Sequence, residues 1–171
     1  KVGLSNACDA SAPTPPSACG QSAPTAKKRV ATAMPKAPLI EIFHSVQGEG
    51  RFVGVPMTFV RIATCPLRCL YCHNPDTQTM RLEERTTARH VISEAGRYRA
   101  FITPGGGLTV TGGEPLLQAA FVEDLFVGVK QAYGLHTALD TSANGGHRAS
   151  DRLLANTDLV LLDIKAGNPE L

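Results

Sequence analysis

The sequence predicts an α/β fold, specifically a partial (β/α) barrel that is truncated after its fourth strand. Four strand-sized apolar segments alternate with connections of helix length, a pattern typical of βαβ units in a parallel sheet. Residues capable of chemistry follow the ends of these segments, where parallel sheets place their working sites. A chain of 171 residues is too short for a closed barrel of eight units.

The expected elements follow one another along the second part of the chain. Strands are predicted where apolar and β-branched residues cluster between polar or glycine residues, at 58–63, 108–111, 135–139 and 158–164. Helices are predicted where apolar residues recur every three to four positions, at 86–98, 118–133 and, in a short form, at 150–155. Gly134 is expected to end the second helix as its C-cap.

The first 38 residues differ from the rest. They hold six of the 12 prolines and no aromatic residue, so they cannot bury enough apolar surface to offset the entropy of ordering. We therefore predict a disordered tail at 1–38 and a folded core at 39–171. Cys8 and Cys19 lie in this tail and are interpreted as incidental thiols. Because the chain begins with Lys1 and stops at Leu171, we expect a piece of a longer protein.

Composition narrows the class of protein. The formal net charge of +2 favours neither a nucleic-acid partner nor a membrane surface. The apolar segments are far shorter than the roughly 20 residues of a membrane span, and no signal peptide is recognisable. Three of the five cysteines are clustered, which indicates a metal and a reducing, cytoplasmic environment rather than disulfides.

The clustered cysteines form the segment Cys65-Pro-Leu-Arg-Cys69-Leu-Tyr-Cys72, with the spacing C-x3-C-x2-C. Three thiolates on one short loop can bind three corners of a [4Fe–4S] cluster and leave the fourth iron open. An open metal position is typical of a reactive centre. Zinc remains an alternative on spacing alone, with His44 or His136 as the fourth ligand, because His73 is too close to Cys72 to share one ion.

Two further motifs follow predicted strands. In Thr111-Gly-Gly-Glu-Pro115, the glycines allow the backbone to approach a ligand closely, and Glu114 can accept a hydrogen bond from an ammonium group. Asp163 and Lys165 close the fourth strand. Taken alone, they would be interpreted as a surface ion pair, which contributes little stability.

The cysteine triplet, with Tyr71 directly before its last member, resembles the signature of radical S-adenosylmethionine (SAM) enzymes. The resemblance covers roughly residues 40 to 171 and implies a partial barrel of the radical SAM type. It also implies that SAM chelates the open iron through its amino and carboxylate groups. Reductive cleavage of SAM would then generate a 5′-deoxyadenosyl radical, with flavodoxin or ferredoxin as the electron donor.

Other motifs resemble the activating enzymes of glycyl radical enzymes, whose substrate is a partner protein. These motifs are Cys-His-Asn-x-Asp-Thr after the triplet, Leu-Asp-Thr after the third strand and Leu-Asp-Ile-Lys at the fourth. The resemblance assigns SAM contacts to Tyr71, Asn74, Gly112, Gly113, Glu114, Asp163 and Lys165. It assigns a monovalent-cation site beside the SAM carboxylate to Asp140, Thr141, the Leu161 carbonyl and Asp163.

One segment departs from this pattern. Gln47-Gly-Glu-Gly50 and the following residues resemble 7-carboxy-7-deazaguanine synthases, radical enzymes that act on a pterin, and Ala143 stands where activating enzymes often have glycine. Three hypotheses therefore remain. They are, in order, an activating enzyme for a glycyl radical enzyme, a 7-carboxy-7-deazaguanine synthase acting on 6-carboxytetrahydropterin, and a non-catalytic binding module stabilised by zinc.

Overall fold

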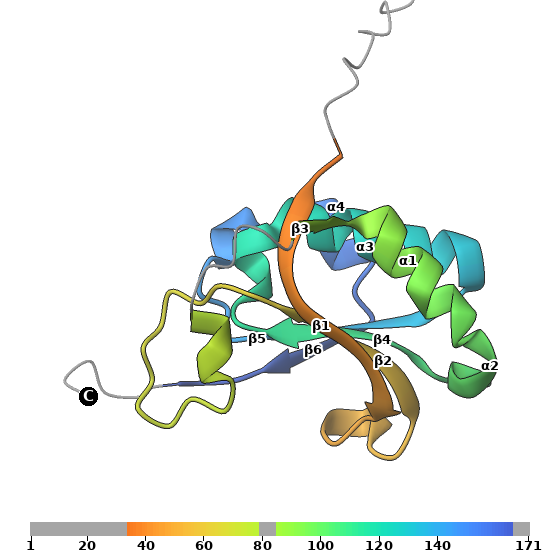
Figure 1. Cartoon of the computed structure of the whole chain (residues 1–171), viewed down its shortest axis with the longest axis horizontal. Coiled ribbons are helices and arrows are strands. Elements are labelled where there is room, and N and C mark those ends of the chain that lie inside the picture. Colours follow the sequence, from red (N-terminus) through yellow and green to blue (C-terminus); the bar gives the residue numbers. More distant parts are fainter. Residues whose placement is uncertain (1–33, 79–84, 166–171) are drawn as a thin grey trace, which may run out of the picture. The chain divides into compact units, whose positions relative to one another are not determined.

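The computed structural model describes residues 34–78 and 85–165, which form one six-stranded sheet with helices on one face (Figure 1). The strand order is β3-β1-β2-β4-β5-β6. The strands are β1 (Lys36–Val46), β2 (Pro56–Ile62), β3 (Arg85–Thr87), β4 (Gly107–Gly112), β5 (His136–Thr141) and β6 (Leu159–Leu162). The helices are α1 (Ala88–Arg97), α2 (Arg99–Ile102), α3 (Ala119–Tyr133) and α4 (Asp151–Ala155). Short 3₁₀ turns are η1 (Gly50–Phe52), η2 (Pro75–Gln78), η3 (Pro115–Gln118) and η4 (Gly146–Arg148).

The four predicted strands are present as β2, β4, β5 and β6, and neighbouring members pair in parallel. Helical segments connect them in sequence, so each strand lies beside the next one along the chain. The sheet of the described residues is open rather than closed, which confirms the prediction of a partial barrel. The carboxyl ends of the four strands consequently meet at one edge.

Two strands were not predicted. β1 runs antiparallel to β2 and pairs at its other side with the short β3. β1 begins at Lys36, so the last residues of the predicted tail belong to the sheet instead. Pro38 has no N–H to donate to the sheet, but its carbonyl accepts a hydrogen bond from Ala63 N at 3.0 Å. The tail prediction for residues 1–33, including Cys8 and Cys19, lies outside the described residues.

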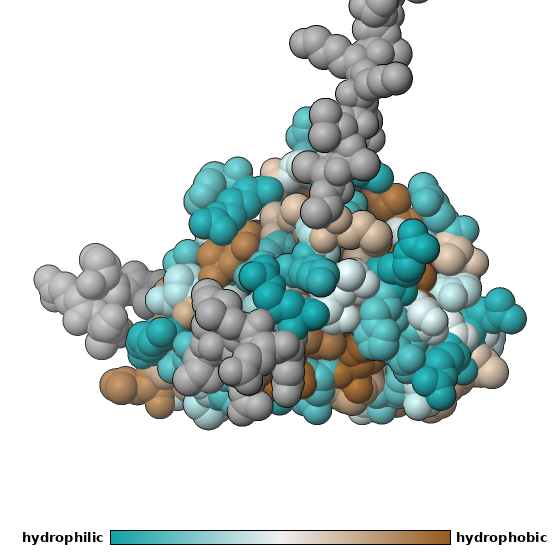
Figure 2. All heavy atoms as spheres, turned by 45° about the horizontal axis from the view of Figure 1, so that its top comes forward, coloured by the Kyte–Doolittle hydropathy of each residue, from teal (hydrophilic) through white to brown (hydrophobic). Residues whose placement is uncertain are grey.

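The core lies between the sheet and the helices. Side chains on one face of the parallel strands, including Val60, Ile62, Leu108, Val110 and Leu139, are buried. They pack against the apolar sides of α1, α3 and α4. The opposite sides of the helices carry polar residues, and Figure 2 shows mainly hydrophilic surface on this side with separate apolar areas. No helix in the described ranges is long and apolar enough to span a membrane.

The helix ends agree with the signals in the sequence. The predicted helix at 86–98 is α1, which starts at Ala88 because Thr87 is its N-cap and accepts from His90 N. Gly134 adopts φ 63° and caps α3 as predicted. Ser150 caps the short α4 through a hydrogen bond from Leu153 N at 3.0 Å.

The segment between β1 and β2, residues 47–55, lies on the face of the sheet opposite the helices (Figure 1). We call it the hairpin loop. The buried side chain of Gln47 holds it there, with Nε2 donating to Thr109 Oγ1 on β4 at 3.1 Å and Oε1 accepting from Gly48 N at 3.0 Å. Phe52 packs against His136 of β5, with the ring centroids 4.0 Å apart. The loop therefore brings the Gln47–Gly50 motif towards β5 and β6.

Candidate functional site

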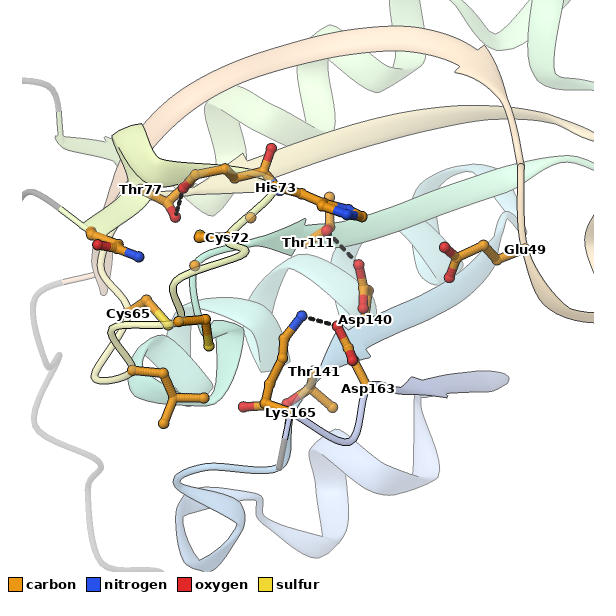
Figure 3. Close-up of a pocket in the computed structure, with 17 residues that line it drawn as sticks. Glu49, Cys65, Cys72, His73, Thr77, Thr111, Asp140, Thr141, Asp163 and Lys165 are labelled. Carbon is orange, nitrogen blue, oxygen red and sulfur yellow. Dashed lines mark hydrogen bonds and ion pairs between the residues drawn. The ribbon is translucent and has the colours of Figure 1, made fainter. Parts of the chain in front are cut away.

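A pocket opens at the carboxyl edge of the parallel strands and collects most of the predicted site residues (Figure 3). The predicted residues that line it are Cys65, Cys69, Cys72, Asn74, Gly112, Gly113, Asp140, Thr141, Asp163 and Lys165. They come from the loop after β2, from the ends of β4 and β5, and from the segment after β6. Two predicted residues, Tyr71 and Glu114, do not line the pocket.

The cysteine loop forms one side of the pocket. All three thiols are free and partly exposed, and Cys65 and Cys72 lie on the side opposite Glu49 in Figure 3. Burial raises the pKa of the Cys65 thiol, and the negative charges of Glu114 and of the other two cysteines add to this effect. In the described part of the chain, no three His, Cys, Asp or Glu residues are arranged around a single metal ion. Three cysteine sulfurs on one loop fit the donor set of a [4Fe–4S] cluster, in which each thiolate binds a different iron rather than one shared ion.

The two glycines at the end of β4, Gly112 and Gly113, are needed for a reason that the sequence did not reveal. A Cβ atom on Gly113 would lie 1.9 Å from the carbonyl oxygen of Thr64, and one on Gly112 would lie 2.5 Å from that of Ile62. Gly113 N and Glu114 N donate to these same two carbonyls, each at 2.8 Å. The glycines thus let the start of the cysteine loop pass directly against the end of β4. Both also line the pocket, and close approach of their backbone to a ligand stays a prediction.

The prediction for Glu114 requires a correction. Its side chain is fully buried, with an exposed fraction of 0%. One carboxylate oxygen accepts from Leu116 N and Thr141 Oγ1, and the other accepts from Ser142 N and Ser142 Oγ. These four donors occupy the carboxylate, so it ties the Gly-Gly-Glu-Pro turn to the end of β5 and does not face a ligand in the pocket.

Asp140 is the innermost acid of the pocket. Its Oδ2 accepts from Thr111 Oγ1 at 2.6 Å (Figure 3). Burial raises the pKa of Asp140 above its ordinary value. The hydrogen bond from Thr111 opposes this effect, while the nearby charges of Glu49 and Asp163 add to it. The carboxylate is therefore poorly solvated and favours a cationic neighbour.

Asp163 and Lys165 form an ion pair inside the pocket rather than on a distant surface. The hydrogen bond to Asp163 raises the pKa of Lys165, so its amino group carries a positive charge close to the cysteines. Tyr71 contributes differently from the prediction, because its hydroxyl donates to the carbonyl oxygen of Lys165. Tyr71 therefore links the cysteine loop to the segment after β6, without lining the pocket.

The monovalent-cation site remains a prediction. Asp140, Thr141 and Asp163 all line the pocket, whereas Leu161 does not. The hydroxyl of Thr141 donates to Glu114 at 2.5 Å, and its carbonyl accepts from Asp163 N at 3.0 Å. Asp140 and Asp163 are therefore the two members of the set that present charged oxygens to the pocket.

Neither histidine considered as a zinc ligand lies with the cysteines. His44 stacks on Tyr98 at 3.5 Å and contacts Thr58 Oγ1 at 3.0 Å, on the helix side of the sheet. His136 begins β5, at the end of the sheet opposite the pocket. Spacing along the chain had allowed both interpretations, but the sheet separates these residues from the cysteine loop.

The pocket also contains residues that sequence reasoning missed, which are Glu49, Leu67, His73, Thr77, Gln78, Thr111 and Ser142. Glu49 comes from the hairpin loop and extends towards Asp140 (Figure 3). The Gln47–Gly50 motif was recognised in the sequence, but its place in the pocket depends on a loop that folds across the sheet. Thr111 directly precedes the predicted Gly112, and Ser142 directly follows the predicted Thr141. Their position at strand ends is the sequence signal that could have identified them.

A family comparison identifies the class of enzyme to which this fold and this cysteine-lined pocket belong. Residues 59–171 match the family model described as the Radical SAM superfamily. The match covers more than half of the chain, and the chain belongs to the radical SAM superfamily of enzymes. Family membership favours a [4Fe–4S] cluster and SAM over the zinc-stabilised module.

Curated relatives narrow the comparison from the superfamily to one kind of enzyme to which the chain is similar. The chain is 44% identical over 131 residues to a pyruvate formate-lyase-activating enzyme of Staphylococcus epidermidis, covering 71% of this chain and 52% of the relative. It is 43% identical over 131 residues, with the same coverage, to the enzyme of that name from Staphylococcus aureus strain USA300. The chain thus spans about half the length of these curated relatives.

A solved structure shows a similar fold. The crystal structure of QueE from Escherichia coli superimposes with a TM-score of 0.53 at 20% sequence identity. The superposition covers 73% of this chain and 69% of that chain. At this identity the likeness concerns the fold alone, and it agrees with an open α/β sheet of the radical SAM type.

Proposed function

We propose that this protein cleaves SAM reductively at a [4Fe–4S] cluster and installs a glycyl radical on a partner enzyme. The observation that carries the proposal is the pocket itself, in which three free thiols face Asp140, Asp163 and Lys165 across the strand ends. The similarity to pyruvate formate-lyase-activating enzymes supports a glycyl radical enzyme as the substrate. The cofactors would supply the one-electron chemistry that yields a 5′-deoxyadenosyl radical.

The residues of the chain have separable roles in this proposal. Cys65, Cys69 and Cys72 would hold the cluster, which would supply the electron for cleavage of SAM. The positive charge of Lys165 and the donors of Asn74 suit oxygen atoms of the cofactor. Asp140 and Asp163 suit a cation, either a monovalent ion or a charged group of the cofactor. Flavodoxin or ferredoxin is proposed as the electron donor.

The proposal is tested by electron paramagnetic resonance. The full-length protein is loaded with iron and sulfide anaerobically, reduced, and mixed with SAM and pyruvate formate-lyase or another glycyl radical enzyme. We expect the doublet of a glycyl radical together with release of 5′-deoxyadenosine. The Cys69→Ser variant is the control and is expected to give neither signal. Release of 5′-deoxyadenosine without a doublet on any glycyl radical enzyme would contradict the proposed substrate.

One observation favours a second candidate function, that of a 7-carboxy-7-deazaguanine synthase. Glu49, from the motif that resembles those enzymes, lies in the pocket and extends towards Asp140. The carboxylate of Glu49 can accept hydrogen bonds from a polar small-molecule substrate in the pocket. Incubation with 6-carboxytetrahydropterin and SAM, followed by mass spectrometry, decides between the two. Formation of 7-carboxy-7-deazaguanine would replace the first proposal.

A further inference from the structure

Arg61 is the second-to-last residue of strand β2, and its guanidinium group lies at the centre of a polar network beside the pocket. Its Nη1 donates to Asn74 Oδ1 at 3.0 Å, and Nη1 and Nη2 donate to the two carboxylate oxygens of Asp76 at 3.1 and 2.9 Å. Its Nε lies 2.8 Å from Glu41 Oε1 on β1, an ion pair without hydrogen-bond alignment. One side chain therefore joins β1, β2 and the loop after the cysteines.

Arg61 does not line the pocket, but Asn74 does. The side chain of Arg61 is 17% exposed, and all three of its nitrogens have an oxygen within 3.1 Å. A guanidinium with acceptors on several sides has little freedom to turn towards a ligand. Any effect of Arg61 on the pocket must therefore pass through the residues it contacts.

The contact with Asn74 fixes which end of its amide faces the pocket. An asparagine amide has an accepting oxygen and a donating nitrogen of nearly the same shape, so the hydrogen-bond partners decide its orientation. Because Oδ1 accepts from Arg61, the amide nitrogen is the end left for a ligand. The main chain is held as well, since the Asn74 carbonyl accepts from Thr77 N at 3.0 Å and from Thr77 Oγ1 at 2.6 Å.

We propose that Arg61 is a positioning residue that orients the Asn74 amide so that it donates to an oxygen of bound SAM. The inference rests on the proposed function, because it takes SAM as the ligand of this pocket. Without the guanidinium, the amide can rotate by half a turn and present its oxygen, which repels an oxygen of the ligand. The clamp on Glu41 and Asp76 keeps the guanidinium in place while the ligand enters and leaves.

A double-mutant cycle tests this role. The dissociation constant of SAM is measured by equilibrium dialysis on the anaerobically loaded full-length protein and on Arg61→Lys, Asn74→Ala and the double variant. Each single change is expected to weaken binding roughly 10-fold, the effect of losing one charge-assisted or oriented hydrogen bond. The double variant is expected to bind about as weakly as Asn74→Ala alone, because Arg61 acts through that amide.

Arg152→Lys is the matched control, since it alters an ion pair to Glu123 that lies outside the pocket. Iron content per chain and the thermal midpoint without SAM are recorded for every variant and should stay at the level of this control. If Arg61→Lys loses iron, Glu41→Gln replaces it. That variant loosens the clamp from β1 and should weaken SAM binding only when Asn74 is present.

The outcomes separate the two proposals. Equal loss of affinity from Arg61→Lys with and without Asn74 would show that Arg61 acts independently of the amide and would overturn the inference. Unchanged affinity in Arg61→Lys, with normal binding by the wild type, would do the same and leave the proposed function intact. A wild-type protein that retains its cluster and does not bind SAM would overturn the proposed function first, and the inference with it.

Discussion

At the scale of single residues, Gly113 makes the closest approach in the site. The carbonyl oxygen of Thr64 lies 1.9 Å from the position of a Cβ atom, and this oxygen belongs to backbone that cannot rotate away. We expect Gly113→Ala to displace the start of the cysteine loop and to cost about 1–3 kcal/mol, as overpacking does. Thermal unfolding and iron content after anaerobic loading measure the two effects.

The control for this change is Gly146→Ala, because a Cβ atom there meets nothing within 4 Å. It is expected to leave the thermal midpoint and the iron content close to the wild-type values. Equal behaviour of the two variants would show that the loop relaxes around the added methyl group. The tight contact with Thr64 would then have no part in cluster binding.

Glu114 is the second residue whose role the structure redefines. Glu114→Gln keeps the shape of the side chain but turns one acceptor into an NH₂ group that faces donors from Ser142 or Thr141. We expect a loss of about 2–3 kcal/mol in the free energy of unfolding, as for a buried hydrogen bond to a charged group. Urea denaturation measures this loss. The control is Glu94→Gln, which removes an i,i+3 ion pair to Arg97 on the helix surface and is expected to cost under about 1 kcal/mol.

The sequence identified most pocket residues because chemistry-bearing types followed strand ends. It failed for Glu114 because a carboxylate looks the same whether it faces a ligand or four backbone and hydroxyl donors. It failed for Glu49 because the position of that residue depends on a loop folded across a sheet by Gln47 and Phe52. Contacts between residues distant in the chain decided both cases.

At the scale of elements, Asp158 connects three of them. It lies before β6, its carboxylate contacts Lys130 Nζ of α3 at 2.5 Å, and it accepts from Thr137 N of β5 at 2.9 Å. Burial alone would raise the pKa of Asp158, but the hydrogen bonds from Lys130 and Thr137 hold it below its ordinary value. The carboxylate therefore helps to fix the edge strand and the helix that covers it.

This lowered pKa gives a pH dependence with a definite sign. The stabilising contribution is complete above the unfolded-state pKa of about 3.9 and disappears as the pH falls through the lower folded-state pKa. We expect Asp158→Asn to cost about 1 kcal/mol at pH 7, a value discounted for partial exposure. Urea denaturation from pH 7 to pH 2 should show the difference from wild type shrinking in acid. Asp124→Asn on α3, the helix that carries Lys130, is the control. A difference from wild type that stays constant with pH would contradict the assignment to Asp158.

Local signals predicted the elements with caps well, because Thr87, Gly134 and Ser150 act within a few residues. β1 escaped prediction although many of its residues are apolar, because proline content at its start indicated a tail and its pairing partners are distant from it in the sequence. The alternation of strands and helices in the sequence predicts only the parallel part of the sheet. The antiparallel pairing of β1 with β2 lies outside that pattern, so it was not predicted.

At the scale of the whole molecule, the two ends of the cysteine loop, Thr64 and Thr77, are held to each other and to the segment after β4. The loop has few backbone hydrogen bonds between these ends. Thr64 N donates to Thr77 O at 2.6 Å, and Glu114 N donates to Thr64 O at 2.8 Å. Between Cys65 and His73, within the described residues, the backbone bond formed is from Cys72 N to Cys69 O at 3.3 Å. A cluster bound to three thiols would cross-link the centre of this loop.

We therefore expect cluster loading to stabilise the fold and to order the cysteine loop selectively. A ligand present at 100 times its dissociation constant adds about 2.7 kcal/mol, which corresponds to a rise of roughly 5–10 °C in the thermal midpoint. Hydrogen exchange should slow most in residues 65–73, where the cluster would block local opening, and in α3 only by as much as the global stability rises, because its buried contacts exist without the cluster. The comparison uses loaded and chelator-stripped protein, with Cys69→Ser as the variant that cannot close the cross-link. Equal protection of the loop in that variant would mean that something other than the three-thiolate cluster orders it.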